Sequence, residues 1–171
     1  MKINFSILFC SIVLLSNCIY SLPLNNIDQD PFLRTWLFVG PFDDFEEAKV
    51  VSDSLSKLST DQILSFVDSE KEIEAHVITS SSNSGIHSIH QYFPDNNKFI
   101  LGFSSIALKD STTLYYNHFL NSENADFSFY LNDRIIYENS MDSWPWRKIK
   151  VPSGNSKIRL IVKTSHKSIA S

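Results

Sequence analysis

The chain has 171 residues, of which 43% are hydrophobic and 13% aromatic, and its net charge is −4. This length and composition suffice to bury one core, so a wholly disordered protein is excluded and a single compact domain is expected. The acidic net charge disfavours binding to phosphates, and we therefore expect no nucleic-acid partner.

Residues 1–21 have the layout of a secretory signal peptide. Lys2 precedes an apolar run, Phe5 to Leu15, that is too short to span a membrane as a helix. The letters LSNC, Leu15 to Cys18, resemble a bacterial lipobox, which predicts a signal peptide of residues 1–17 and lipidation of Cys18. Cleavage after Ser21 is the alternative. We expect an exported lipoprotein of the cell envelope or outer surface or, with the alternative cleavage, a soluble secreted or periplasmic protein.

Both cysteines, Cys10 and Cys18, lie within this N-terminal segment. The domain that follows therefore has no disulfide and no thiol chemistry of its own. An exported domain without disulfides must rely on its core, which fits bacterial secretion better than a small eukaryotic secreted scaffold.

Both helices and strands are predicted in the first half of the mature chain. A polar linker, residues 18–33, leads to a strand at 34–42 (RTWLFVGPF) that ends at Gly40-Pro41. Apolar residues at three- and four-residue spacing behind an Asp cap predict a helix from Asp43 to Leu58. A second helical turn is expected at Thr60–Leu64, followed by a weak strand and a Ser-rich loop from Thr79 to Gly85.

From residue 86 onward the sequence predicts strands only. Short strands separated by turn clusters are typical of an antiparallel β-sandwich or barrel, so we expect one mostly β domain over residues 34–171 with one or two short helices near its N-terminus. The predicted strands are Ile86–Phe93, Phe99–Leu108, Thr113–Leu120, Phe127–Leu131, Arg134–Tyr137, Arg147–Val151 and Lys157–Lys163.

The stretch FSFYLNDRIIY, Phe127 to Tyr137, is predicted to be a hairpin with Asn132 and Asp133 at its tip. A tight primed turn requires positive φ at both tip residues, which Asn and Asp tolerate. Leu131 should pair with Arg134, Tyr130 with Ile135 and Phe129 with Ile136. Alternation then places on the core face Phe127, Phe129, Leu131 and Ile136, and on the opposite face Ser128, Tyr130, Ile135 and Tyr137.

Four local features resemble a galactose-binding-like, jelly-roll β-sandwich domain of exported bacterial proteins. They are WLFVGPF from Trp36 to Phe42, Leu114-Tyr115-Tyr116, the corner YLNDR from Tyr130 to Arg134, and Ser153-Gly154-Asn155 followed by IRLIV. Asp133 departs from the Gly that the family prefers. The chain also ends at HKSIAS without the closing strand, which indicates either a shortened domain or a fragment. The resemblance implies a mostly non-catalytic sandwich that binds carbohydrate or acts as a spacer or sensor.

No motif in the chain predicts catalysis or a metal site. His87 and His90, three residues apart on a predicted strand, would face opposite sides and could not chelate one ion. No G-x-S-x-G elbow is present, and the acidic pairs 43–44 and 46–47 are explained by the helix dipole. We therefore expect no enzyme, no catalytic residue and no cofactor, apart from a weak signal for structural Ca²⁺ at Glu123 and Asp126.

The segment MDSWPWRK contains the candidate ligand-binding residues Trp144, Trp146 and Arg147. Indole rings can stack on a sugar, and Arg can hydrogen-bond its hydroxyls. Alternatively, the two Trp side chains cover one end of the sandwich as core. The sequence thus predicts a non-catalytic binding module, anchored to the membrane through Cys18, whose partner is a glycan or an envelope protein. The alternative is a structural, spacer or sensory domain without a small-molecule ligand.

Overall fold

The computed structural model describes residues 22–26, 33–70, 72–80, 89–117, 127–138 and 146–164. Within these ranges the chain is mostly β, as predicted, with two short α-helices and one 3-10 turn. The elements are β1 (Leu24–Asn26), β2 (Thr35–Phe42), α1 (Phe45–Leu55), α2 (Thr60–Asp68), β3 (Glu74–Thr79), η2 (Ile89–Gln91), β4 (Phe99–Leu108), β5 (Thr112–Asn117), β6 (Phe127–Leu131), β7 (Arg134–Glu138), β8 (Trp146–Val151) and β9 (Gly154–Lys163).

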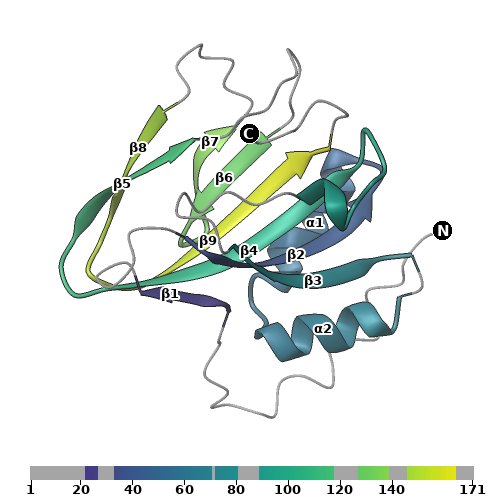
Figure 1. Cartoon of the computed structure of the whole chain (residues 1–171), viewed down its shortest axis with the longest axis horizontal. Helices are drawn as coiled ribbons and strands as arrows, with labels where there is room; N and C mark the ends of the chain where they lie inside the picture. Colours follow the sequence, from purple (N-terminus) through teal and green to yellow (C-terminus); the bar gives the residue numbers. More distant parts are fainter. Residues whose placement is uncertain are drawn as a thin grey trace.

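The strands form one large sheet and one small one (Figure 1). The large sheet has the order β3-β2-β4-β9-β6-β7, and each of these neighbouring pairs is antiparallel. The short strand β1 runs parallel to the second half of β4. The small sheet is the antiparallel pair of β5 and β8, which stands apart at the left of Figure 1.

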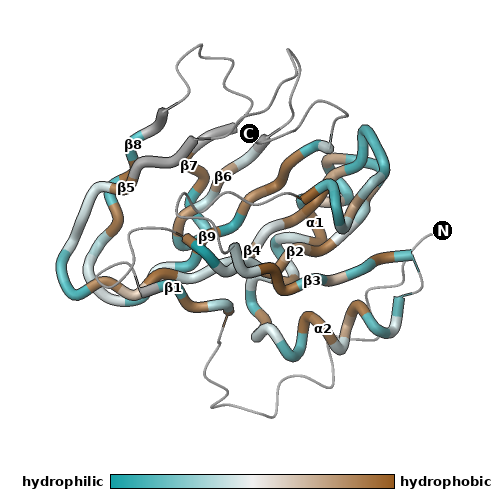
Figure 2. Tube along the Cα trace, in the orientation of Figure 1, coloured by the Kyte–Doolittle hydropathy of each residue, from teal (hydrophilic) through white to brown (hydrophobic). Residues whose placement is uncertain are grey.

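Both faces of the large sheet are covered, and each contributes to a separate core. On one face, Leu37, Leu101 and Ile161 pack against buried residues of α1 and α2. On the other face, Phe38, Ile158 and their neighbours pack against Ile149 and Val151 of β8. The two sheets thus stack in a sandwich-like arrangement, with the helices outside the large sheet. In Figure 2, α2 alternates between hydrophobic and hydrophilic residues, as a helix covered on one side must.

Polar side chains cap both helices. The carboxylate of Asp44 accepts hydrogen bonds from the backbone N–H groups of Glu46 and Glu47, so the predicted Asp cap is confirmed. Ser59 and Gln62 form a reciprocal capping box at the start of α2. The acidic residues Glu46 and Glu47 lie in the first turn of α1, where the helix dipole favours them.

Most strand bounds agree with the prediction, but the strand Ile86–Phe93 is wrong in its described part. Residues Ile89–Gln91 form the 3-10 turn η2. The backbone N–H groups of Tyr92 and Phe93 both donate to the carbonyl of Ile89, and the Phe93 side chain is buried in the core. The turn buries the Phe93 ring in the core, so this apolar stretch is stabilised without pairing to a neighbouring strand.

The predicted linker, residues 18–33, contains residues that belong to the fold. Leu22 is buried in the helix-side core, and β1 follows it. The side chain of buried Asn25 donates to the carbonyl of Thr35 and to Ser104 Oγ, and it accepts from the backbone N–H groups of Arg34 and Thr35. These bonds explain how a polar LNN segment, which carries no strand pattern, is held beside β4.

The hairpin of β6 and β7 has the predicted tip. Asn132 and Asp133 have φ values of 49° and 63°, both positive, as a primed turn requires. The Asn132 amide donates to Ser156 Oγ at 3.1 Å and accepts from the backbone N–H of Lys157 at 2.8 Å. The corner therefore also fixes the hairpin to β9.

The pairing of this hairpin differs from the prediction at one place. Leu131 pairs with Arg134 and Tyr130 with Ile135, as expected, but a bulge makes Phe129 pair with Tyr137 rather than with Ile136. Phe129, Leu131 and Ile136 pack in the core between the two sheets, which confirms their predicted face. Tyr130 points to the other face, and there it is buried because the helices cover that side.

We predict that Asn132→Ala lowers the free energy of unfolding by about 1–3 kcal/mol, because it loses both side-chain hydrogen bonds and places a Cβ without a polar partner at positive φ. Asn132→Gly keeps the backbone conformation and loses only the hydrogen bonds. In urea unfolding, Asn132→Ala should be more destabilised than Asn132→Gly. Equal free energies of unfolding would contradict the expected cost of placing alanine at positive φ.

Candidate functional site

The side chains of the three predicted ligand-binding residues are not among those that the structure describes. Trp144 lies outside the described residues. Trp146 and Arg147 begin β8, where their backbones pair with Asn117 and Tyr116, but their side chains are outside the description. Cys18, His87, Glu123 and Asp126 also lie outside the described residues, so the lipidation site and the weak calcium signal stay predictions.

The described part of the chain contains neither a cluster of metal-binding side chains nor a helix that could span a membrane. In those ranges, no three His, Cys, Asp or Glu side chains are grouped so that they could hold a metal ion. None of the described helices is long and apolar enough to cross a membrane.

An exposed aromatic ring lies beside a polar pair at the edge of the large sheet. We call Glu74, His76, Tyr92 and Phe93 the β3 edge site. His76 Nε2 lies 3.0 Å from Glu74 Oε2. The His76 ring centroid is 5.1 Å from that of Tyr92 and 5.3 Å from that of Phe93. The Tyr92 side chain thus lies next to groups that can donate and accept hydrogen bonds.

The local sequence explains how this site is positioned. Glu74 and His76 are two residues apart on β3, so their side chains share a face, and His76 is in register with Phe38 of β2. The turn η2 places Tyr92 and Phe93 over that face. Phe93 is 2% exposed and anchors the turn in the core between the sheets, whereas Tyr92 is 38% exposed. The anchored neighbour therefore holds the exposed ring in place.

This arrangement is suited to binding a sugar. A tyrosine ring that keeps an accessible face can stack on the apolar face of a pyranose, and the His and Glu side chains can hydrogen-bond its hydroxyls. Half-exposed rings of this kind bind at low entropic cost when they are already held in position.

Sequence reasoning missed this site. Glu74, His76 and Tyr92 carry no motif, and they meet only because η2 folds back over β3. The strand predicted for Ile86–Phe93 would have placed Tyr92 in a ladder instead. The one usable signal was the adjacent aromatic pair Tyr92-Phe93 just before the turn letters PDNN.

A second polar cluster lies beneath α1, and it is centred on Arg159 of β9. The Arg159 side chain is only 4% exposed. Its Nη1 donates to Asp53 Oδ1 at 2.7 Å and to Ser52 Oγ at 3.1 Å, and its Nη2 lies 3.4 Å from Asp133 Oδ1. The guanidinium therefore connects the helix, the sheet and the hairpin tip.

Tyr130 completes this cluster. The guanidinium carbon of Arg159 lies 4.3 Å from the centroid of the Tyr130 ring, a cation–π contact between register partners of β6 and β9. Burial raises the pKa of the Tyr130 phenol above its usual value, against the opposing effect of the nearby Lys49 and Arg159 charges. The phenol is thus neutral, and its ring contact with Arg159 joins β6 to β9 within the cluster.

Comparisons with protein-family models, with curated proteins and with solved structures found no match for this chain.

We predict that Asp53→Ala lowers the free energy of unfolding by about 1–3 kcal/mol, because it leaves the buried Arg159 guanidinium without its close counter-ion; the estimate is reduced because Asp53 is 57% exposed. Arg159→Met should cost less, since the carboxylates it leaves behind are hydrated. Thermal and urea unfolding of both variants test the order. A larger loss for Arg159→Met would contradict this account of the cluster.

Proposed function

We propose that the chain is an exported, non-catalytic binding module that binds carbohydrate at the β3 edge site. In this proposal a lipid on Cys18 anchors the module to a membrane of the cell envelope. The domain would then be of the galactose-binding-like kind that the sequence resembles. Its partner is a glycan, either free or part of an envelope polymer.

The single observation that carries the proposal is the exposed Tyr92 ring beside the His76–Glu74 pair. Among the residues whose side-chain exposure the structure describes, the exposed large apolar ones are Leu24, Val50, Val77, Tyr92 and Ile135, and of these five only Tyr92 is aromatic. Its ring contact with His76 places a hydrogen-bonding group at the side of a stacking surface. Stacking and lateral hydrogen bonds together are what a sugar ring requires.

The use of the buried polar side chains supports a non-catalytic role. Asn25 joins β1 to Thr35 of β2 and to Ser104 of β4, and Arg159 holds α1 against the sheet. Thr164 Oγ1 donates to the carbonyl of Asp95 and accepts from the backbone N–H of Lys98, so it fixes the end of β9. Polar groups that already serve the fold in this way are not poised for reaction.

We predict that Tyr92→Ala weakens glycan binding about tenfold or more, because it removes the stacking surface and leaves the hydrogen-bonding pair in place. A glycan array that includes bacterial envelope polysaccharides would identify a ligand, and calorimetry would measure its affinity. Tyr92→Phe should retain most of the binding, because the ring remains.

The matched control is Ile135→Ala, which shortens a side chain of similar exposure on β7, far from the site in sequence. It should leave glycan binding unchanged. Loss of binding with Trp146→Ala but not with Tyr92→Ala would move the site to the segment Trp144 to Arg147. A chain that binds no glycan at all would instead be a structural, spacer or sensory domain.

We further predict that the wild-type chain expressed in a bacterium fractionates with membranes, and that Cys18→Ser releases it into the soluble fraction, since one thiol carries the proposed anchor. Mass spectrometry of the wild-type N-terminus should show lipid on Cys18. A mature chain that begins at Leu22, after cleavage at Ser21, would contradict the anchor without affecting the binding site.

A further inference from the structure

The polar pair of the β3 edge site presents hydrogen-bond acceptors to a ligand. His76 Nε2 lies 3.0 Å from Glu74 Oε2, and because an ionised carboxylate only accepts, the imidazole N–H is the donor of this bond. In neutral His76 the other ring nitrogen is then an acceptor. The Glu74 side chain is 65% exposed, and its second oxygen has no hydrogen-bond partner among the described residues. A ligand at this edge therefore meets a carboxylate that is open to a donor or to a positive charge.

The chain on both sides of the site adds further negative charge. The described segments 72–80 and 89–95 supply β3, the turn η2 and the Tyr92 ring. These two segments contain no Lys or Arg, but they contain three exposed carboxylates, Glu72, Glu74 and Asp95. The local field at this edge is thus negative and favours a cationic ligand over an anionic one.

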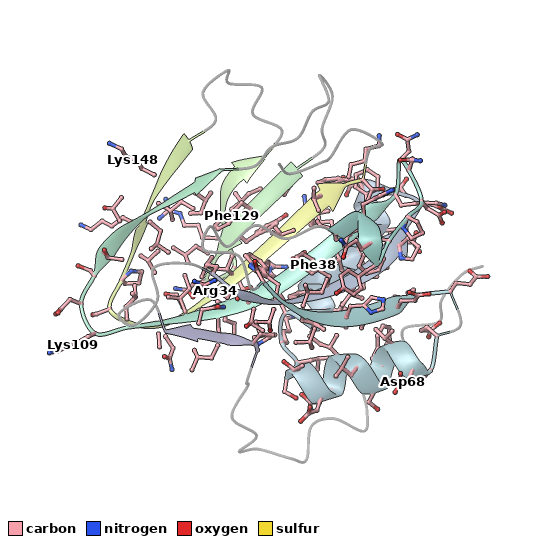
Figure 3. All side chains as sticks on the ribbon, in the orientation of Figure 1. Arg34, Phe38, Asp68, Lys109, Phe129 and Lys148 are labelled. Atoms are coloured by element: carbon pink, nitrogen blue, oxygen red, sulfur yellow. The ribbon has the colours of Figure 1, made fainter. Side chains whose placement is uncertain are left out.

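Several basic side chains lie where they leave this charge in place. The Lys98 ammonium, which follows the second segment, forms an ion pair with Asp43. Arg159 is buried beneath α1, on the other face of the large sheet. Figure 3 shows Lys109 and Lys148 extending outward at the left of the molecule, whereas β3 lies to the right of them in Figure 1.

We propose that the glycan bound at the β3 edge site is an amino sugar with a free ammonium group, which Glu74 binds while the sugar ring stacks on Tyr92. This inference rests on the proposed function and names its substrate class. The face of an aromatic ring is negative and attracts a cation as well as an apolar sugar face, so the ring and the carboxylate select the same ligand. His76, which contacts both of these side chains, accepts a hydrogen bond from a sugar hydroxyl.

The same arrangement disfavours other classes of sugar. Acetylation of the nitrogen removes the positive charge, so an N-acetyl sugar keeps the stacking contact and loses the ion pair. A uronic acid or a phosphorylated sugar brings negative charge to an edge that already carries it, which lowers the affinity. A neutral hexose can stack and can donate from its hydroxyls, but it offers no cation to Glu74. The expected order of affinity is amino sugar, neutral sugar, acidic sugar.

Two oligosaccharides that differ only in N-acetylation test the proposal. They are the glucosamine tetramer and its fully N-acetylated counterpart, and calorimetry compares them with the mature protein in one buffer, at a pH below the pKa of the sugar amine. The free amine should strengthen binding about fivefold or more, because an exposed ion pair and an exposed cation–π contact each contribute a factor of about two to five.

The variant Glu74→Gln should reduce this preference for the free amine about threefold, because it removes the charge and keeps the size of the side chain. Its affinity for the acetylated tetramer should change little, since Tyr92 remains. The matched control is Asp61→Asn, which removes an exposed carboxylate from α2 and changes the net charge equally. This control should keep the full preference for the free amine.

Equal or tighter binding of the acetylated tetramer, still dependent on Tyr92, would overturn this inference and leave the carbohydrate site standing. Equally tight, Tyr92-dependent binding of a tetralysine peptide would also overturn it and would assign the edge to cationic chains in general. If neither tetramer bound while the glycan array showed a Tyr92-dependent ligand, only this inference would fail. A blank array and no binding of either tetramer would remove the proposed function as well.

Discussion

The pairing of β4 with β9 is the interaction on which the rest of the structure depends. The two strands pair over ten residues, from Phe99 opposite Lys163 to Leu108 opposite Gly154. β2 and β1 attach to the free side of β4, and β6 attaches to the free side of β9. At their far end both strands turn and continue as the pair β5 and β8, so one pairing organises both sheets.

This pairing also explains why both cores are so tightly constrained. Alternate residues of β4 enter different cores: Leu101 and Phe103 face the helices, and Ile100 and Ile106 face the small sheet. Gly102 lies between them, where an added Cβ would come within 2.8 Å of Leu160 Cγ. A side chain at this position would displace Leu160 and Phe38, the register partners of Gly102 on β9 and β2.

The sequence was sufficient for the elements whose pattern is local. The bounds of β4 and β6 agree with the prediction, and so does the tip at Asn132 and Asp133. Tyr130 was placed on the correct face, but its burial was not predicted, because period-two alternation does not show that a second layer covers that face of the strand. β1 was missed because its three residues depend on the distant hydrogen bonds of Asn25. The β3 edge site was missed for the same reason: His76 and Tyr92 meet only through tertiary structure.

The distribution of charge over the fold could not be predicted from the sequence either. A net charge of −4 argues against a broad basic surface, but it says nothing about how charge is distributed over a layered fold. Lys148 and Lys150 of β8 are exposed on the small sheet, whereas Lys157 and Arg159 of β9 reach the helix side, where they donate hydrogen bonds to the carbonyl of Ser56 and to Asp53. In the proposed function, the β3 edge site presents Tyr92 to a glycan, and the buried side chains beneath it hold the ring in position.

The most direct test of the central claim is an NMR titration of the isotopically labelled protein with a sugar that it binds. We predict that the largest chemical-shift changes occur at His76, Tyr92 and the backbone of η2, with smaller changes at Glu74. Changes confined to Trp144, Trp146 and Arg147, or spread over the whole chain without a centre, would contradict a binding site at the edge of β3.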